Sequence, residues 1–415
     1  MAGAVEDKLG IYVSIPFCRS KCTYCNFASG VYPAADHARY VDRVIEDLVG
    51  VAAWAERIGA DLPRCVDTVY LGGGTPSLLA PELFAGLFAA MRADFSFDSD
   101  AEITVECAPG QIAEAMPSAM AASGVNRVSL GVQSFVDSEA HATGRLHDRL
   151  TVENDLRQLR AAGITNLNVD LIAGLPGQTS SSWDESLNAL LASGVPHASV
   201  YMLEVDEDSR LGREMLKGGS RYRAALVPSD DAIARMYERA IEQLNTAGLQ
   251  QYEISNFARP GFESRHNLRY WQRQPYLGLG LDASSMLGSN RTLAVTETRQ
   301  GGDTQDFVVR ATTTDELNEY LRCPGTAETA WLSLNRQHEE AWFLGLRLNA
   351  GVEISALQRE FGRDMVEPAM KTVARLVDDE LLSFDGERIR LTARGRLISN
   401  DVFQEFLIAD AATAR

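Results

Sequence analysis

The sequence predicts an α/β protein: a partial (β/α)6 barrel followed by a small C-terminal α+β domain that resembles a winged helix. Six short apolar runs alternate with amphipathic segments up to residue 203, which indicates parallel βαβ units. Polar or glycine-rich residues follow the strands, where the functional groups of a barrel gather. From about Thr329 the pattern changes to helices and a hairpin. We therefore expect a tail at 1–10, a barrel at 11–260, a connecting region at 261–328 and a C-terminal domain at 329–415.

The predicted barrel strands are short apolar runs: Ile11–Ile15, Thr68–Leu71, Glu102–Glu106, Arg127–Gly131, Asn168–Ile172 and Ala198–Leu203. The predicted helices between them have apolar residues at helical spacing: Asp36–Ile58, Pro81–Arg92, Ile112–Ser123, Ser138–Thr143 with Thr151–Ala162, and Ser180–Ala192. No Gly-x-Gly-x-x-Gly opens the first helix, which argues against a Rossmann domain. Residues 204–229 are rich in charged residues, glycine and serine and predict an excursion or lid, and a helix follows at Asp231–Ala247.

The C-terminal domain is expected to contain a helix around Trp342, helices at Ile354–Phe361 and Pro368–Asp379, and a closing helix at Thr392–Leu407. A hairpin at Leu382–Leu391 turns at Asp385-Gly386. Acidic residues surround this hairpin, so DNA binding is disfavoured and a docking or dimerisation role is favoured.

Composition excludes several classes of function. The net charge is −18, from 39 basic and 57 acidic residues, which makes a nucleic-acid partner unfavourable. No run approaches 18 apolar residues, so we expect no membrane span. The N-terminus lacks the basic start and apolar core of a signal peptide. Six cysteines, three of them in one cluster, suit a reducing cytoplasm, with any membrane contact peripheral to its inner face. The other three, Cys65, Cys107 and Cys323, are expected in or near the core.

The segment Ile11–Phe27 contains the strongest chemical signal. Cys18, Cys22 and Cys25 are spaced C-x3-C-x2-C directly after an apolar strand that Pro16 ends. Thiolates on one loop make a soft-metal site. Structural zinc and ordinary iron–sulfur clusters take four ligands, whereas a [4Fe–4S] cluster held by three leaves one iron open to a small molecule. The alternatives are a zinc site completed by His37 and three cysteines without a ligand.

Other polar residues lie at the ends of the predicted strands. The glycines Gly72–Gly74 can expose backbone groups to a ligand, or form a plain βα turn. Glu106 can pair with a ligand amino group or ribose hydroxyl, or form a structural salt bridge to Arg127 or Arg145. Asp170 is costly to bury unless it is hydrogen-bonded, so it is either a ligand contact or a satisfied core carboxylate. Gln133 lies just past the fourth strand.

A polar and aromatic motif, His266–Trp271, follows the barrel. A His beside Tyr and Trp is a candidate ligand for a flat aromatic cofactor. A hydrogen-bonded structural His is the alternative.

Together these residues resemble the HemN/HemW branch of the radical S-adenosylmethionine (SAM) superfamily, the oxygen-independent coproporphyrinogen III oxidase-like proteins, and within it the HemW-type haem chaperones. The resemblance covers residues 9–408. Its motifs are Tyr12–Cys18, Cys18–Cys25, Gly72–Ser77, Gly131–Phe135, Asp170–Pro176, Glu253–Phe257 and His266–Trp271. The fold that it implies is the radical SAM partial (β/α)6 TIM-like barrel with the C-terminal domain of the HemN/HemW proteins.

The resemblance implies roles for individual residues. Cys18, Cys22 and Cys25 ligate a [4Fe–4S] cluster whose open iron is capped by SAM. The implied SAM contacts are Tyr12, Gly73, Gly74, Thr75, Glu106, Gln133, Arg145 and Asp170. The implied haem contacts are His266, Asn267, Tyr270 and Trp271, in the connecting region.

The chain departs from the family pattern in places. Ser14 stands where a His is usual, Cys107 and Ala108 replace commoner pairs, and Asp282 begins a segment that often carries a His. The oxidases have a fourth cysteine where this chain has Phe27, and a longer segment before the cluster, whereas only 17 residues precede Cys18 here. These last two differences favour the chaperone branch.

The expected function is therefore a haem chaperone that binds haem and delivers it to apo-haemoproteins such as respiratory cytochromes. The alternative is a radical SAM enzyme, either a coproporphyrinogen III oxidase that decarboxylates propionates or a HemN-like methyltransferase. An enzyme would need an electron donor such as flavodoxin or ferredoxin. The chaperone reading also allows a homodimer. A zinc-stabilised barrel is the non-catalytic alternative.

Overall fold

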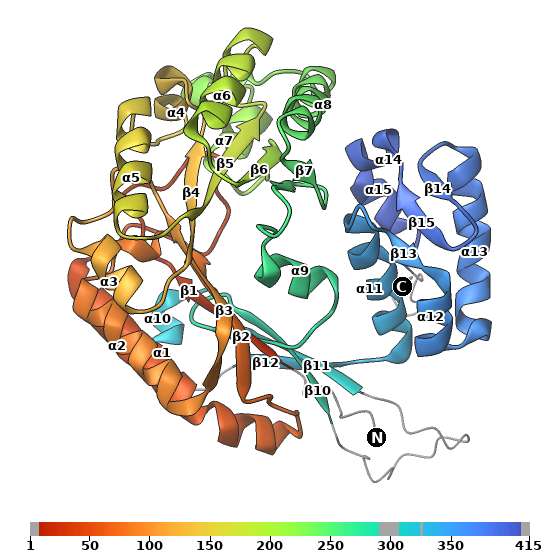
Figure 1. The fold of residues 1–415 in the computed structure, drawn as a ribbon, viewed down its shortest axis with the longest axis horizontal. Coiled ribbons are helices and arrows are strands. Elements are labelled where there is room, and N and C mark those ends of the chain that lie inside the picture. Colours follow the sequence, from red (N-terminus) through yellow and green to blue (C-terminus); the bar gives the residue numbers. More distant parts are fainter. Residues whose placement is uncertain (1–7, 290–306, 324–326, 408–415) are drawn as a thin grey trace.

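In the computed structural model of the protein, residues 8–289, 307–323 and 327–407 are described. They form a large α/β unit and a smaller C-terminal unit, which stand side by side in Figure 1.

The large unit is built on six parallel strands that lie next to one another in chain order. They are β1 (Leu9–Ile15), β2 (Cys65–Gly73), β3 (Ser96–Cys107), β4 (Arg127–Gln133), β5 (Asn166–Ala173) and β6 (His197–Met202). The helices between them are α1 (Ala34–Ile58), α2 (Pro81–Asp94), α3 (Met116–Ala122), α4 (Asp137–Ala142), α5 (Arg149–Ala161) and α6 (Ser180–Ser193). The 3-10 turn η1 (Pro76–Leu78) follows β2. The predicted partial (β/α)6 barrel is therefore confirmed.

The two faces of the barrel sheet differ because side chains alternate along a strand. The outer face is apolar, and Val13, Leu71, Val105, Val128 and Leu167 are all fully buried against the helices. Fully burying one such side chain contributes about 1.5–3 kcal/mol. The inner face carries polar side chains in register across neighbouring strands: Ser14, Glu106, Ser129, Asn168 and His197. The apolar outer face holds the barrel together, and the polar inner face is left for function.

Among the described residues, the sheet continues beyond the barrel at both edges and contains twelve strands. β9 (Tyr276–Leu279), β10 (Ser284–Ser289), β11 (Phe307–Thr313) and β12 (Ala327–Leu332) extend it from β1, and β8 (Asn256–Ala258) and β7 (Gln250–Gln251) extend it from β6. The helices α8 (Asp230–Thr246), α9 (Arg265–Trp271) and α10 (Leu317–Tyr320) also belong to this unit. Much of the expected connecting region thus belongs to the main sheet.

The expected excursion after β6 contains α7 (Arg210–Leu216) and η2 (Arg221–Leu226). It is attached to the cysteine loop, because the Leu211 amide donates to the Thr23 carbonyl at 2.8 Å. The Asn26 amide donates to the Asp206 carboxylate, also at 2.8 Å.

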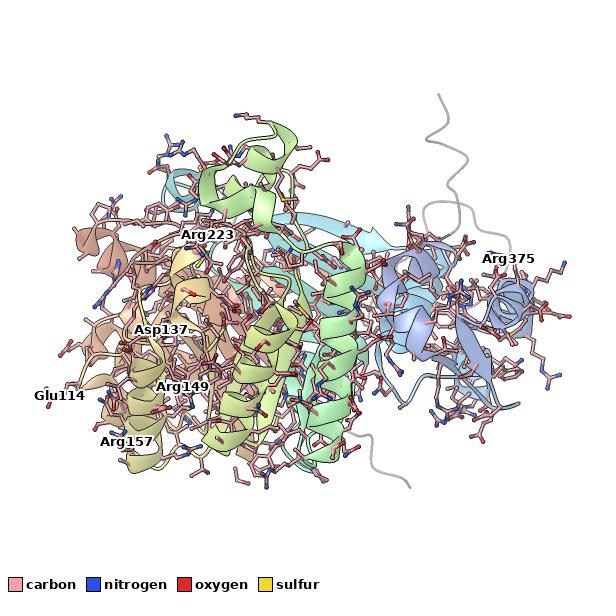
Figure 2. All side chains as sticks on the ribbon, turned by 90° about the horizontal axis from the view of Figure 1, so that it is seen from above. Glu114, Asp137, Arg149, Arg157, Arg223 and Arg375 are labelled. Atoms are coloured by element: carbon pink, nitrogen blue, oxygen red, sulfur yellow. The ribbon has the colours of Figure 1, made fainter. Side chains whose placement is uncertain are left out.

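The C-terminal unit has its own core around Trp342. It contains α11 (Leu334–Arg347), β13 (Val352–Glu353), α12 (Ile354–Phe361), α13 (Arg363–Asp378), β14 (Leu382–Phe384), β15 (Arg388–Leu391), α14 (Ala393–Leu397) and α15 (Ser399–Gln404). The predicted hairpin is present, whereas the predicted closing helix is two helices that meet at Ile398. Figure 2 shows this unit, marked by Arg375, at the opposite end of the molecule from Asp137 and Arg149. Among the described residues, no helix is long and apolar enough to cross a membrane.

Candidate functional site

The predicted cluster and SAM residues gather at one pocket, where the barrel strands end. Its cavity volume is about 370 Å³. The predicted residues that line it are Cys18, Cys22, Cys25, Gly73, Gly74, Thr75, Glu106, Gln133, Arg145 and Asp170. Because they come from five different strand ends and their loops, only the barrel topology brings them together.

Backbone hydrogen bonds hold the cysteine loop in shape. The Cys18 amide donates to the Gly30 carbonyl at 2.8 Å, and the Gly30 amide donates to the Pro16 carbonyl at 2.9 Å. The Lys21 ammonium donates to the carbonyls of Phe27 and Ser29 at 3.0 Å. All three cysteines remain partly exposed to the pocket. Backbone hydrogen bonds therefore join the start and the end of the loop, and the three thiols line the same pocket.

The glycine loop after β2 packs directly on the cysteine loop. The Gly74 amide donates to the Ile15 carbonyl at 2.9 Å, and the Thr75 amide donates to the Phe17 carbonyl at 2.8 Å. A Cβ at position 74 would lie 2.7 Å from the Ile15 carbonyl oxygen, and Gly73 has a φ of +96°. Only glycine fits both positions without moving backbone. Backbone packing therefore requires glycine at positions 73 and 74, whether or not a ligand also contacts them.

Glu106 is oriented by two donors. The Tyr70 hydroxyl donates to Oε1 at 2.8 Å, and the Gly73 amide donates to Oε2 at 3.2 Å. Burial, together with the negative charge of the nearby Asp170, raises the pKa of Glu106 to about 7. No ion pair joins Glu106 to Arg127 or Arg145 in the part of the chain that is described. The salt bridge is thus not formed at contact distance, although the positive charge of Arg145 acts to lower the pKa of Glu106, and the carboxyl lines the pocket.

Arg145 and Gln133 converge above Gly131. A Cβ at Gly131 would lie 2.9 Å from Arg145 Nη2 and 3.1 Å from Gln133 Nε2. Gln133 has a φ of 70°, an unusual conformation for a non-glycine residue, at an irregularity in β4. Its Oε1 and the Nε of Arg145 are buried without a hydrogen-bond partner. Buried unpartnered polar atoms that line a pocket are what a polar ligand would satisfy.

Asp170 belongs to a polar network on the inner face. Ser129 Oγ donates to it at 3.1 Å, and Asn168 Nδ2 donates to it at 2.6 Å. His197 Nδ1 lies 2.6 Å from Asn168 Oδ1. Burial raises the pKa of Asp170. Asp170 is thus a hydrogen-bonded carboxylate that also lines the pocket, and its contact with a ligand stays a prediction.

Several pocket residues were missed by sequence reasoning. They are Tyr24, Tyr70, Gln111, Ser129, Asn168, Ser199 and Tyr201. Asn166, Asn168 and Asp170 alternate with apolar residues in β5, and this period of two was a usable signal for a polar inner face.

Tyr12 lies beside the pocket and does not line it. Its ring stacks on Tyr70 with the ring centres 6.1 Å apart. Burial raises the pKa of Tyr12, and the Glu106 carboxylate raises it further. By packing on the Tyr70 ring, Tyr12 helps to hold the hydroxyl group that donates to Glu106.

The three cysteines provide the soft thiol donors that an iron–sulfur cluster needs, and they line one pocket. Among the described residues, no three His, Cys, Asp or Glu side chains converge tightly enough to hold one metal ion. A [4Fe–4S] cluster is larger, and each cysteine binds a different iron. His37, the fourth ligand of the zinc alternative, stacks on Phe17 with ring centres 3.9 Å apart and does not line this pocket. The donor set therefore fits a cluster with one open iron.

The predicted haem motif forms α9, whose first residues contact Thr68 of β2 and Glu102 of β3. His266 is 1% exposed. Its Nδ1 lies 3.0 Å from Thr68 Oγ1, and its Nε2 lies 2.9 Å from the Tyr270 hydroxyl. Burial lowers the pKa of His266 to about 3. In this conformation both ring nitrogens are within hydrogen-bond distance of side-chain hydroxyls, and haem ligation by His266 stays a prediction.

The other three motif residues point in different directions. Asn267 lines the cysteine pocket. Tyr270 packs edge-on against Tyr276 with ring centres 4.6 Å apart. The Trp271 ring lies under the guanidinium of Arg347 from α11, at 4.3 Å. The motif therefore joins the barrel to the C-terminal unit, and haem binding by these residues stays a prediction.

The departures from the family pattern lie at or near the site. Ser14 is buried, and its Oγ would lie 2.8 Å from a Cβ at Gly73. Cys107 is buried and lines the pocket, and burial raises its pKa to about 12. Asp282 has a φ of 53° in the turn between β9 and β10. Cys323 was expected in or near the core and is exposed.

Comparison with known proteins covers both units. Residues 12–190 match the radical SAM superfamily model, and residues 332–398 match the HemN C-terminal domain model. The heme chaperone HemW of Lactococcus lactis is 32% identical over 399 residues, which cover 96% of this chain and 97% of that protein. The heme chaperone HemW of Escherichia coli is 34% identical over 294 residues, or 70% of this chain and 74% of that one. The solved structure of the radical SAM enzyme coproporphyrinogen III oxidase (HemN) from Escherichia coli has a TM-score of 0.78 and 25% identity, covering 98% and 91% of the two chains.

Proposed function

The chain belongs to the HemW family of the radical SAM superfamily, and from this premise we propose that it is a haem chaperone, which binds haem and passes it to apo-haemoproteins. The observation that carries the proposal is the 32% identity to a heme chaperone over nearly the whole of both chains. Phe27, in place of the fourth cysteine expected of an oxidase, supports the same choice.

At the cysteine pocket we propose that Cys18, Cys22 and Cys25 hold a [4Fe–4S] cluster. When reduced, such a cluster with SAM supplies radical chemistry. Glu106 is oriented by Tyr70 and Gly73 to receive an ammonium group. Arg145 and Gln133 offer polar atoms without partners, which suit a carboxylate and hydroxyl groups. These side chains bind and orient a zwitterionic ligand at the open side of the cysteine loop.

His266 has a different role in this proposal from the one implied by the motif. Its ring stacks on Tyr70 with the centres 5.3 Å apart, and Tyr70 donates to Glu106. We therefore assign His266 as a positioning residue for the SAM side of the pocket. Haem ligation by His266 would require α9 to leave its place in the barrel.

The experiment is a titration of the anaerobically reconstituted protein with haem, followed by Soret absorbance, in wild type and His266→Gln. We expect tight binding by both proteins, and a several-fold loss of SAM affinity in the variant alone. Loss of haem binding in the variant would show that His266 is a haem ligand and would overturn its assignment as a positioning residue. No binding by wild type would refute the chaperone function.

A radical SAM oxidase is the second candidate, because the HemN enzyme of Escherichia coli shares the fold over 98% of this chain. Incubation with coproporphyrinogen III, SAM and a reductant distinguishes the two functions. The chaperone proposal expects no protoporphyrinogen IX, and its formation with consumption of SAM would favour the oxidase. The release of 5′-deoxyadenosine without decarboxylation would instead indicate another radical SAM reaction.

A further inference from the structure

A line of hydrogen bonds runs from the cysteine pocket through the inside of the barrel to the start of α9. Asn168 Nδ2 donates to Asp170 of β5 at 2.6 Å, and His197 Nδ1 of β6 lies 2.6 Å from Asn168 Oδ1. His197 Nε2 lies 2.9 Å from the Tyr252 hydroxyl, to which the Ser264 amide donates at 3.1 Å. We call these five residues the Asp170–Ser264 network.

The chemistry of the members fixes the direction of each bond in this network. A carboxylate only accepts, so Asn168 turns its NH2 group to Asp170 and its carbonyl oxygen to His197. Burial lowers the pKa of His197 well below its usual range, so the ring is neutral. Its hydrogen is therefore on Nδ1, facing an oxygen that can only accept, and Nε2 is the acceptor. Tyr252 thus donates to Nε2 and accepts from the Ser264 amide.

All four bonds of the network point toward the negative charge of Asp170. Hydrogen bonds in series strengthen one another, and a bond that ends on a charged group is stronger than one between neutral groups. Water has little access to the inner members, because Asn168, His197 and Ser264 are at most 2% exposed. The strength of the whole network therefore depends on Asp170 as an ionised carboxylate that is protected from water.

The far end of the network holds the first turn of α9. Ser264 is the N-cap residue: its Oγ accepts from the Asn267 amide at 3.3 Å, and its carbonyl accepts from the Leu268 amide at 3.0 Å. Its own amide is the group that donates to Tyr252. Asn267 also lines the cysteine pocket. The network thus leaves this pocket at Asp170 and returns to it at α9.

Tyr252 also connects the network to the C-terminal unit. Its carbonyl accepts from the amide of Asn349, which follows α11, at 3.0 Å. The Asn349 side chain donates to the Gln251 carbonyl at 2.6 Å. The segment before the Glu253–Phe257 motif is therefore held by the second unit, which keeps the Tyr252 hydroxyl between the barrel and the start of α9.

We propose that His197 and Tyr252 are positioning residues that couple ligand binding at Asp170 to the position of α9. The inference rests on the proposed function, with Asp170 as a predicted SAM contact and α9 as the helix of the predicted haem motif. A SAM hydroxyl that donates to Asp170 stabilises the carboxylate form, which is the acceptor that the network needs. Bound SAM also excludes water that competes for the same oxygens. SAM therefore stabilises α9 in its observed position.

Coupling between two binding events is reciprocal. If SAM holds α9 in place, a haem that is ligated by α9 residues and displaces the helix weakens SAM binding by the same factor. SAM would therefore favour the release of haem from α9. This gives SAM a role in haem transfer that needs no radical reaction.

The test measures hydrogen exchange of the α9 amides in the full chain, reconstituted anaerobically with its cluster, with and without saturating SAM. In wild type we expect SAM to slow this exchange by about fivefold or more. Tyr252→Phe removes the shared hydroxyl and keeps the ring, so SAM should slow exchange by less than about twofold. Tyr237→Phe is the matched control. It also removes a buried tyrosine hydroxyl, which donates to the Ile254 carbonyl and accepts from Gln251 outside the network, and it should respond as wild type does.

His197→Phe interrupts the network at a second position and should behave as Tyr252→Phe does. SAM affinity is measured in every protein by equilibrium dialysis, so that each exchange experiment is done at saturation. A full SAM response in both network variants would overturn the coupling, as would a wild type that binds SAM without any change in α9. A response that is also lost in Tyr237→Phe would overturn the specific role of the network. Failure of wild type to bind SAM would instead refute the proposed SAM pocket.

Discussion

At the scale of single residues, the pocket contains side chains whose chemistry depends on burial. Glu106 is the clearest example, because its pKa is raised to about 7 by burial and by Asp170 while two donors hold its position. A carboxyl group with such a pKa changes charge in the neutral range. Its ability to bind an ammonium group therefore depends on pH.

We expect the affinity for SAM to increase from pH 6 to pH 8. The carboxylate form of Glu106 attracts the ammonium group, and at pH 6 only about a tenth of a group with a pKa near 7 is ionised. Affinity should therefore be about tenfold weaker at pH 6. Equilibrium dialysis with labelled SAM measures it, and Glu106→Gln should bind weakly without this dependence. An identical pH profile in the variant would show that Glu106 is not the group that binds the ammonium of SAM.

Cys22→Ser tests the cluster. We expect the variant to lose the brown colour and most of the iron and labile sulfide after anaerobic reconstitution, because an alcohol does not replace a thiolate as an iron ligand. Cys65→Ser is the control, since Cys65 lies at the start of β2, away from the pocket. Iron and sulfide at the wild-type level in Cys22→Ser would exclude it as a ligand.

At the scale of elements, the glycine loop and the cysteine loop form one unit. The loop after β2 donates two amides to the backbone just before the cysteines, and the approach is close enough to exclude a Cβ. The conformation of the cysteine loop thus depends on the loop that follows β2. Neither loop would hold its geometry without the other.

Gly74→Ala should displace the cysteine loop. The new Cβ would meet backbone atoms of Ile15, Pro16 and Phe17 at 2.7 to 2.8 Å, so we expect a loss of about 1–3 kcal/mol of stability and reduced cluster content. Chemical denaturation and iron analysis measure both. Gly86→Ala, in an open position of α2, should be stabilising by up to about 1 kcal/mol. Normal cluster content in Gly74→Ala would mean that the contact is not needed for loop geometry.

At the scale of the whole molecule, α9 connects segments that are far apart in the sequence. Arg269 is 2% exposed and pairs with Asp67 of β2. It also donates to the carbonyls of Lys8 and Pro275 at 2.9 Å. Next to it, Trp271 contacts Arg347 of the C-terminal unit, and Arg273 pairs with Glu360 at 2.6 Å. One short helix thus joins the barrel start, the added strands and the second unit.

Arg269→Met should be strongly destabilising, by about 3–5 kcal/mol, because it leaves Asp67 and two carbonyls without their partner. Arg265→Met removes a partly exposed ion pair to the same Asp67 and should cost about 1 kcal/mol or less. Unfolding in urea, followed by circular dichroism, compares the two. Equal losses would show that burial of the pair is not what makes it important.

Much of the fold and part of the site could be predicted from the sequence. Apolar runs of strand length, helical spacing and turn residues are local signals, so the six barrel strands and the C-terminal hairpin were predictable. The C-x3-C-x2-C spacing is also local, because all three thiols lie on one loop. These features depend on neighbours in the chain, and a sequence records such neighbours directly.

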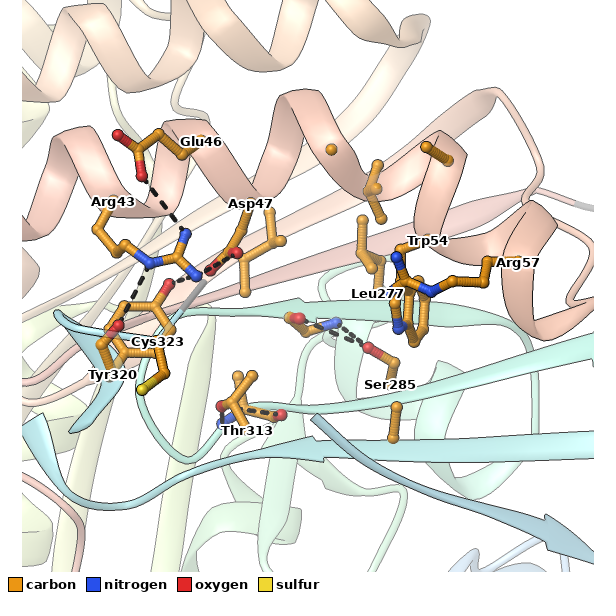
Figure 3. A pocket seen from close by; sticks show the side chains of 17 residues that line it. Arg43, Glu46, Asp47, Trp54, Arg57, Leu277, Ser285, Thr313, Tyr320 and Cys323 are labelled. Carbon is orange, nitrogen blue, oxygen red and sulfur yellow. Dashed lines mark hydrogen bonds and ion pairs between the residues drawn. The ribbon is translucent and has the colours of Figure 1, made fainter. Parts of the chain in front are cut away.

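Only the tertiary structure decided the rest. Tyr70, Asn168 and Ser199 come to the pocket from separate strands, and their polarity alone did not mark them as part of it. The sequence allowed His266 to be either a haem ligand or a hydrogen-bonded structural residue. Only the structure shows that it is buried against Thr68 and Tyr70, which are about 200 residues away in the chain. The cavity between α1 and the strands β9, β10 and β11 (Figure 3) likewise arises where α1 meets strands that lie more than 200 residues later. Long-range packing determines which polar groups are satisfied and which surfaces stay open, and local patterns do not contain that information.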